Sequence, residues 1–320
     1  MWKEYIENGE YEKAFNLAKE DKEVWNAILA ESKRLREKFY GKKINLYYPG
    51  DKFPSISVTG TVCQLNCKHC GRRYLKHMVP LTTPTKLKDY CMKLADNDGN
   101  GCLISGGYTL GGFVPLKPFI ETIKEIKETT NLQVNVHTGV VDQETAKLLA
   151  YAGVDSVSVD IAGDQKILDE IYGLKRSPED YLETLKNLKE QNIKITPHIG
   201  IGFYYGKILH EFKALQFVKE VDPDVLVFVV LRPTRGTAFE KITPPSLEDT
   251  LLIMAISRIV FKNKSISLGC MRPSGHIRLE LEYKSAKNIV NRLATPSRYL
   301  ITRLKKEGYE IKIDEKCCTL

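Results

Sequence analysis

Three cysteines close together have the clearest chemistry in this sequence. Cys63, Cys67 and Cys70 lie in the segment Cys-Gln-Leu-Asn-Cys-Lys-His-Cys, a C-x3-C-x2-C spacing. Three thiolates on one tight loop can bind three irons of a [4Fe–4S] cluster and leave the fourth iron free for a small molecule. The alternative is a structural zinc site, which prefers four ligands in two separated pairs and is disfavoured by this spacing. The motif therefore predicts an iron–sulfur cluster with one open coordination position.

Polar residues and glycines also follow several short apolar segments. They are Ser105-Gly106-Gly107, His137, Asp160, the segment from His198 to Gly202 and Cys270. Glycine lets a ligand approach the backbone closely, and a carboxylate such as Asp160 can accept two hydroxyl hydrogen bonds. The structural alternatives are a tight turn at Gly106-Gly107, a helix N-cap at Asp160 and hydrogen-bonded core positions for the two histidines.

The elements that position these residues alternate regularly from residue 54 onward. Expected strands are Ser55–Thr59, Gly101–Ser105, Leu132–His137, Ser156–Asp160, Ile193–Ile199, Val225–Leu231, Ser265–Gly269 and Ile289–Ala294. Expected helices include Leu116–Thr129, Gln143–Tyr151, Pro178–Gln191, Leu247–Phe261 and Arg298–Glu307. Alternating strands and helices imply a parallel sheet. The pattern predicts an α/β fold, a parallel (β/α)8 barrel of the TIM type, with a partial (β/α)6 barrel as the alternative. In such barrels the loops after the strands form the active-site face, which is where the residues above fall.

The chain divides into three expected parts. Residues 1–50 are polar and helix-favouring, and we expect a helical N-terminal extension there. Residues 51–310 carry the barrel pattern, and residues 311–320 form a C-terminal tail that contains Cys317 and Cys318.

Composition limits the other possibilities. The apolar segment Val225–Leu231 is too short to span a bilayer, and the N-terminus lacks a secretory signal, so we expect a cytoplasmic protein without membrane association. The net charge is +8, but no dense basic run with stacking aromatics indicates nucleic-acid binding. In this compartment the eight cysteines are expected to be ligands or free thiols rather than disulfides. Cys91 and Cys102 lie in apolar patterns typical of the core.

The remaining three cysteines suggest a second cluster. Cys270 follows the seventh expected strand, at the barrel mouth, while Cys317 and Cys318 end a tail that can fold over that mouth. Together they would supply three ligands of an auxiliary [4Fe–4S] cluster, with Ser297 a candidate for the last iron. The alternative is a buried core Cys270 and a redox-sensitive tail.

The cysteine spacing resembles the signature of the radical S-adenosylmethionine (SAM) superfamily. The resemblance implies that the open iron binds SAM and that an added electron splits SAM into methionine and a 5′-deoxyadenosyl radical. It places His69 against the adenine and makes Ser105-Gly106-Gly107 similar to a Gly-Gly-Glu element that binds the methionine amino group, with Tyr108 replacing the glutamate. It also matches Asp160 to a carboxylate that binds the ribose. The segment with Gly200 and Gly202 resembles a Gly-x-Ile-x-Gly element that packs against adenine.

A narrower resemblance covers residues 55 to 320. The segments Ser57–Cys63, Asn135–Gly139, Gly269–Pro273 and Cys317-Cys318 look like the biotin synthase-related group, most of all the archaeal-type two-component lipoyl synthases. This implies a sulfurtransferase that adds sulfur at C6 or C8 of an octanoyl chain on a carrier protein, with the auxiliary cluster as the sulfur source. It also implies a second radical SAM subunit as a partner and an electron donor such as ferredoxin or flavodoxin.

Two other functions fit the same residues. One is a single-cluster radical SAM enzyme that catalyses methylation, a mutase reaction or C–C bond formation, in which the C-terminal cysteines are dispensable. The other is a non-catalytic iron–sulfur partner protein, which would fail to cleave SAM.

Overall fold

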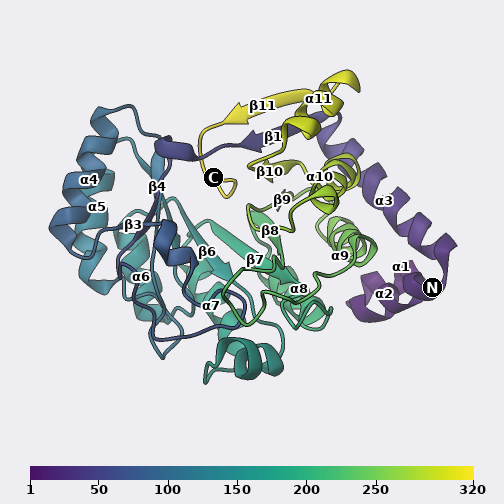
Figure 1. Cartoon of the computed structure of the whole chain (residues 1–320), viewed down its shortest axis with the longest axis horizontal. Helices are drawn as coiled ribbons and strands as arrows, with labels where there is room; N and C mark the ends of the chain where they lie inside the picture. The colour runs from purple at the N-terminus through teal and green to yellow at the C-terminus, as the bar shows by residue number, and fades with distance from the viewer.

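The computed structural model describes residues 1–320 and is built on one sheet of eleven strands. The strand order is β11-β1-β10-β9-β8-β7-β6-β5-β4-β2-β3, and every neighbouring pair is parallel. The sheet curls around the C-terminal end of the chain (Figure 1). The strands are β1 Lys43–Tyr47, β2 Ser55–Ser57, β3 Val79–Pro80, β4 Gly101–Ser105, β5 Gln133–His137, β6 Ser156–Asp160, β7 Ile195–Ile201, β8 Val225–Val230, β9 Ser265–Leu268, β10 Arg292–Ala294 and β11 Glu310–Asp314.

The eight strands expected from the sequence correspond to β2 and β4 to β10, which are neighbours in chain order. The parallel α/β barrel is therefore confirmed, but it is a partial barrel. In a closed barrel β2 and β10 would pair with each other. Here β3 covers the free edge of β2, and β1 and β11 extend the sheet beyond β10, so the barrel stays open. A partial barrel was the alternative expectation, but that alternative had six strands, whereas this sheet has eleven.

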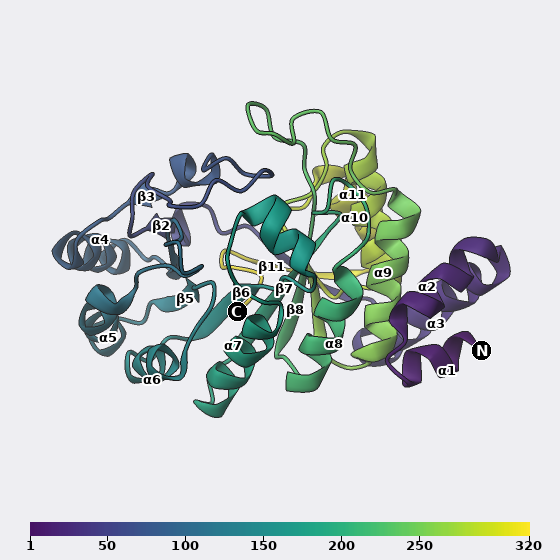
Figure 2. The same cartoon turned by 90° about the horizontal axis from the view of Figure 1, so that it is seen from below.

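Helices surround the sheet (Figure 2). They are α1 Trp2–Glu7, α2 Tyr11–Glu20, α3 Lys22–Tyr40, α4 Pro84–Asp96, α5 Ile120–Thr129, α6 Gln143–Tyr151, α7 Glu179–Glu190, α8 Glu211–Val221, α9 Leu247–Val260, α10 His276–Asn288 and α11 Arg298–Lys306. The helices after β1 cover the outer face of the sheet, whereas α1 to α3 pack outside α9 and α10 (Figure 2). Several begin at side-chain caps: Thr83 before α4, Asp142 before α6 and Ser246 before α9 each accept a hydrogen bond from a main-chain N–H of the first turn. No helix combines the length and apolar character needed to cross a bilayer.

The N-terminal helices pack on the barrel through α3, which lies against α9 and α10. Arg36 on α3 is fully buried and donates to the carbonyls of Gly41, Lys43 and Val290. It therefore joins the helical segment to the starts of β1 and β10. The expected division into a helical extension (1–50), a barrel (51–310) and a tail (311–320) stays a prediction. In the structure, β1 near the start of the chain pairs with β11 near its end.

Polar side chains occupy the inner face of the middle strands, where a barrel core is usually apolar. Asn135 Oδ1 accepts hydrogen bonds from Ser156 Oγ at 2.9 Å and Ser158 Oγ at 3.1 Å. Ser158 Oγ also lies 2.9 Å from Thr196 Oγ1. All four side chains are buried, and the shared hydrogen bonds offset the cost of removing them from water. This part of the inner face is therefore a buried, hydrogen-bonded polar wall rather than an apolar core.

A buried charge network joins the β9–α10 loop to the end of β10. Glu282 on α10 is fully buried and accepts from Arg272 Nη2 at 2.7 Å and Arg278 Nε at 2.7 Å. Arg272 also donates to the carbonyls of Gly269 and Ala294. The network thus fixes the main chain on both sides of Cys270.

We predict that Glu282→Gln lowers the free energy of unfolding by about 3–5 kcal/mol, because Arg272 would remain buried without an anion. Urea denaturation measures the change. The matched control is Glu144→Gln, which removes the exposed partner of Lys117 and should cost less than about 1 kcal/mol. Equal losses in the two variants would contradict the assignment of Arg272 and Glu282 as a buried pair.

Candidate active site

The three cysteines of the C-x3-C-x2-C motif lie on the loop between β2 and β3. Main-chain hydrogen bonds fold this loop: Cys70 and Gly71 both donate to the carbonyl of Cys67, at 3.2 and 2.9 Å. Lys68 N donates to Ile171 O at 2.9 Å, which ties the loop to the segment after β6. The sequence therefore folds locally into a turn that brings the second and third cysteines together.

The thiols line one cavity of about 210 Å³ at the carboxyl ends of the strands. Cys63 Sγ accepts from Tyr108 N at 3.2 Å. A hydrogen bond from Cys67 lowers the pKa of Cys70 to about 7, while the same contact and burial raise the pKa of Cys67. No three His, Cys, Asp or Glu side chains converge as ligands of a single metal ion do. Thiolates of a [4Fe–4S] cluster each bind a different iron, so this spacing of the cysteines fits a cluster.

The glycines after β4 form the part of the cavity wall that packs against the cysteine loop. Gly107 N donates to Thr59 Oγ1 at 2.6 Å, and Ser105 Oγ donates to His137 O at 3.2 Å. A Cβ on Gly107 would lie 2.0 Å from Val62 O and 2.6 Å from Cys63 Cα. Only glycine therefore lets β4 pass this close to the cysteine loop. Ser105, Gly106 and Gly107 all line the thiol cavity, as the sequence predicts.

Asp160, at the end of β6, lies in a cluster of histidines on the same cavity wall. His137 Nε2 is 3.3 Å from Asp160 Oδ2, although it makes no hydrogen bond of good geometry. Burial opposes ionisation of Asp160, but the charge of His137 outweighs it and holds the Asp160 pKa below its usual range. The pKa of His137 is raised by Asp160 despite burial, so the two form an ion pair.

The other two histidines near Asp160 are neutral. Burial lowers the pKa of both His69 and His198 to about 4. His198 Nδ1 lies 2.9 Å from Thr196 O, which fixes its ring. His69 lies between Tyr172 and Phe203, and its buried Nδ1 has no hydrogen-bond partner. An unpartnered buried nitrogen beside the thiols is consistent with a polar ligand in this cavity.

Gly200 and Gly202 do not line the thiol cavity. A Cβ on Gly200 would lie 2.9 Å from the ring of Phe203, and Gly202 has a φ of +79° beside Pro245. Phe203 in turn packs on His69, with ring centroids 4.9 Å apart. These glycines therefore shape the cavity through Phe203.

The C-terminal cysteines enter the inner face of the barrel. Asn135 Nδ2 donates to Cys317 Sγ at 3.8 Å, and Cys318 is buried among Tyr47, Val225, Val227 and Ala294. A hydrogen bond from Cys318, with help from Thr319 and Asn135, lowers the pKa of Cys317 to about 6. Cys317 is near enough for its charge to affect both His137 and Cys270. Ser297 caps α11 by accepting from Leu300 N at 3.2 Å.

Arg292 on β10 holds this tail in place. Its Nη1 donates to Cys318 O at 3.2 Å and to Leu320 O at 2.5 Å. Asn100 Nδ2 also donates to Glu315 O at 3.2 Å. Neither Arg292 nor Asn135 was predicted as a site residue from the sequence. Arg292 belongs to no motif, and Asn135 was noted only as the first residue of the segment Asn135–Gly139; the folded tail brings both to Cys317 and Cys318.

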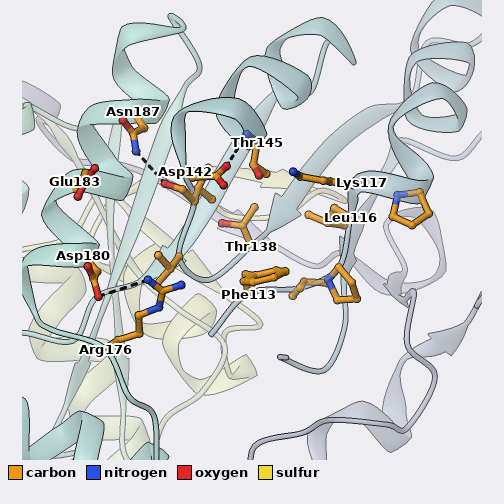
Figure 3. Close-up of a pocket in the computed structure, with 15 residues that line it drawn as sticks. Phe113, Leu116, Lys117, Thr138, Asp142, Thr145, Arg176, Asp180, Glu183 and Asn187 are labelled. Carbon is orange, nitrogen blue, oxygen red and sulfur yellow. Dashed lines mark hydrogen bonds and ion pairs between the residues drawn. The ribbon is translucent and has the colours of Figure 1, made fainter. Parts of the chain in front are cut away.

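Another cavity, of about 390 Å³, contains none of the expected site residues (Figure 3). Several of its polar side chains are engaged with one another or with the main chain. Asn187 Nδ2 donates to Val141 O at 3.0 Å, Asp142 Oδ1 accepts from Thr145 N at 2.7 Å, and Arg176 lies 3.9 Å from Asp180. These contacts brace the loops after β4 and β5 from outside.

Comparison with known proteins gives the family. The model of the radical SAM superfamily matches residues 57–215, a range that includes the cysteine loop and Asp160. The chain belongs to the radical SAM superfamily. Membership implies a [4Fe–4S] cluster and SAM, and the thiol cavity described above fits both.

Distant relatives refine this assignment only slightly. The biotin synthase of Pelobacter propionicus is 23% identical over 265 residues, which is 80% of this chain and 77% of the relative. That of Macrococcus caseolyticus is 25% identical over 311 residues, covering 90% and 88%. This radical SAM enzyme is thus distantly related to biotin synthase.

Solved structures confirm the fold. HydG, a maturase of the [FeFe]-hydrogenase, superposes with a TM-score of 0.69 at 15% identity, covering 97% of this chain and 78% of its own. Methylornithine synthase gives a TM-score of 0.63 at 15% identity, covering 92% and 90%. At these identities the likeness concerns the fold alone.

We predict that Gly107→Ala displaces the cysteine loop of this radical SAM protein, because its Cβ would overlap Val62 O. Iron content after anaerobic reconstitution should fall by about half or more, since a displaced ligand weakens a cluster. The control is Gly173→Ala, which has open space around its Cβ and a φ of +63°, so that it strains the backbone without displacing a neighbour. Full iron content in the Gly107 variant would contradict the close packing of β4 on the loop.

Proposed function

We propose that this radical SAM enzyme inserts sulfur at C6 or C8 of a protein-bound octanoyl chain, as a lipoyl synthase does. The observation that carries the proposal is the second set of thiols. Cys317 and Cys318 lie on the inner face of the barrel, whereas Cys270 is exposed in the loop after β9. Cys317 is close enough to Cys270, and to His137 on the wall of the thiol cavity, to affect the pKa of each. Sulfur insertion needs both a radical source and a sulfur source facing one substrate, and this arrangement could hold the two side by side.

Cys63, Cys67 and Cys70 are proposed to hold the [4Fe–4S] cluster. When bound, that cluster and SAM supply a 5′-deoxyadenosyl radical, which is the group that removes hydrogen from an unactivated carbon. The backbone of Gly106 and Gly107 would accept the amino-acid end of SAM, because the absence of side chains leaves room there. Tyr108 N already donates to Cys63 Sγ, so β4 orients both the ligand and the thiol.

Asp160 is proposed to bind the ribose hydroxyls. Its ion pair with His137 keeps it ionised, and an ionised carboxylate can only accept hydrogen bonds, which matches two hydroxyl donors. His69, held between Tyr172 and Phe203, is in place to lie against the adenine. Gly200 and Gly202 would act indirectly, through the position of Phe203.

Cys270, Cys317 and Cys318 are proposed to hold an auxiliary [4Fe–4S] cluster, which would serve as the sulfur source. Support comes from the tail itself. Arg292 fixes its carbonyls, and Asn135 directs an N–H at Cys317 because the two serine hydroxyls occupy the amide oxygen. Both contacts favour a thiolate held on the inner face rather than a mobile tail.

The partners proposed with this function follow from its chemistry. An octanoylated carrier protein or peptide would be the substrate, a second radical SAM subunit would insert the other sulfur, and a ferredoxin or flavodoxin would supply electrons.

The direct test combines iron analysis with product analysis. We predict about eight irons in the wild type, and about four both in the Cys63/Cys67/Cys70→Ala variant and in the Cys270/Cys317/Cys318→Ala variant. Incubation with SAM, dithionite, the partner subunit and an octanoyl-lysine peptide should add sulfur to the peptide, detected by mass spectrometry, and neither variant should do so. Cys91→Ala, which alters a buried core cysteine, is the control and should keep its iron.

A wild-type content of about four irons, with none in the Cys63/Cys67/Cys70→Ala variant, would overturn the sulfur-insertion proposal. The single-cluster chemistries would then be the functions to test.

We also predict that Asp160→Asn weakens SAM binding about tenfold or more, since it removes a charged hydrogen-bond acceptor. Equilibrium dialysis against labelled SAM measures the effect, and iron content should not change because Asp160 is not a proposed ligand. Asp164→Asn, which alters a carboxylate in the turn after β6, should bind SAM normally. Unchanged affinity in the Asp160 variant would rule out its contact with the ribose.

A further inference from the structure

The surface around the cysteine loop is basic. No aspartate or glutamate lies between Asp51 and Asp89, a segment that contains all three motif cysteines. The basic residues of that segment are Lys52, Lys68, Arg72, Arg73, Lys76, Lys86 and Lys88. The loop after β8 adds Arg232 and Arg235 before its first acid, Glu240.

These two loops are in contact. Tyr74 OH lies 3.0 Å from Thr234 Oγ1 and 3.4 Å from Met271 Sδ. A Cβ on Gly236 would lie 1.8 Å from Arg73 Nη2, so the guanidinium rests directly on the second loop. Figure 2 shows both loops at the same end of the barrel. Their charges therefore form one surface, the basic rim, defined here as Arg72, Arg73, Lys76, Arg232 and Arg235.

The charges of the basic rim are not neutralised within the chain. Arg72, Lys76, Arg232 and Arg235 are exposed and none forms an ion pair. Exposed lysines elsewhere commonly do, as in Lys88–Glu125, Lys117–Glu144 and Lys186–Glu220. The acid at the edge of the rim, Glu240, is occupied by the N–H of Gly236 at 2.7 Å. The rim thus presents several unpaired positive charges above the proposed cluster ligands.

We propose that the basic rim is the docking surface for an acidic one-electron carrier protein. In the step that docking permits, the reduced carrier loses one electron and the cluster on Cys63, Cys67 and Cys70 gains it, with no atom transferred. The inference rests on the radical SAM assignment and on the proposed cluster ligands, but not on sulfur insertion. The docking proposal can therefore fail while the sulfur-insertion proposal holds, and the reverse, so the two outcomes can be distinguished.

The geometry favours an electron carrier over the acyl carrier. An acyl substrate must reach the cavity inside the barrel, whereas electron transfer requires only a close approach to the outside of the loop that holds the cluster. Redox complexes are also small and transient, and charge complementarity mainly raises their rate of association. A compact patch of exposed side chains on two loops suits such a complex.

The experiment reverses charges on the rim while sparing Arg72, which lines the thiol cavity. The double variant is Lys76→Glu/Arg235→Glu. The control is Lys147→Glu/Lys305→Glu, which changes net charge equally at exposed positions on α6 and α11. The probe is an acidic ferredoxin, and its affinity is measured by titration at low and high salt, with and without the cluster. Reduction of the reconstituted cluster is followed by stopped-flow absorbance, with ferredoxin and with dithionite as alternative reductants.

We expect the rim variant to bind ferredoxin at least about tenfold more weakly at low salt and to lose most of its salt dependence. Cluster reduction by ferredoxin should slow by a similar factor, while reduction by dithionite and iron content should match those of the control. Unchanged ferredoxin binding would overturn the proposal. So would an equal loss with dithionite, which would place the effect in the cluster itself, or an equal loss in the control variant, which would reduce it to net charge.

Discussion

The direction of the strands is the constraint on which the rest of this structure depends. Because all neighbouring strands are parallel, their carboxyl ends meet at one end of the barrel. The cysteine loop after β2, the glycine turn after β4, and His137 and Asp160 at the ends of β5 and β6 therefore line one cavity, although nearly a hundred residues separate Cys63 from Asp160. The strand order alone sets the distances between these residues only approximately. Hydrogen bonds such as the one from Tyr108 N to Cys63 Sγ then fix them.

The two ends of the chain complete the barrel in a different way. β1 and β11 pair with each other beyond β10, and the segment after β11 turns back onto the inner face, where Arg292 and Asn135 hold it. An open barrel is necessary for this arrangement, since a closed one would have no edge for β1 to join. The opening thus lets residues near the C-terminus approach those near position 137.

The sequence predicts the repeating part of this architecture well and the irregular parts poorly. All eight strands of the βα pattern are present because buried β-branched segments such as Val225–Val230 have few alternatives. β1, β3 and β11 were missed: Lys43–Tyr47 lies in a segment expected to be helical, Val79–Pro80 is very short, and Glu310–Asp314 is mostly exposed, with only two apolar residues. At the site, motif spacing predicted Cys63, and the position at or just after the end of an expected strand predicted Asp160 and Gly107. The ion pair of Asp160 with His137 and the contact of Asn135 with Cys317 depend on strand register and tail placement, which no local pattern encodes.

The serine, threonine and asparagine side chains on the inner face have a thermodynamic consequence. Ser156, Ser158 and Thr196 direct their hydroxyls at one another and at Asn135, so their hydrogen bonds do not require water. The C-terminal tail lies against this wall at Cys317, and because no donor of the wall is left unpaired, the usual penalty for dehydrating a polar surface is small there. The wall is therefore polar in composition, but removing water from it costs little free energy.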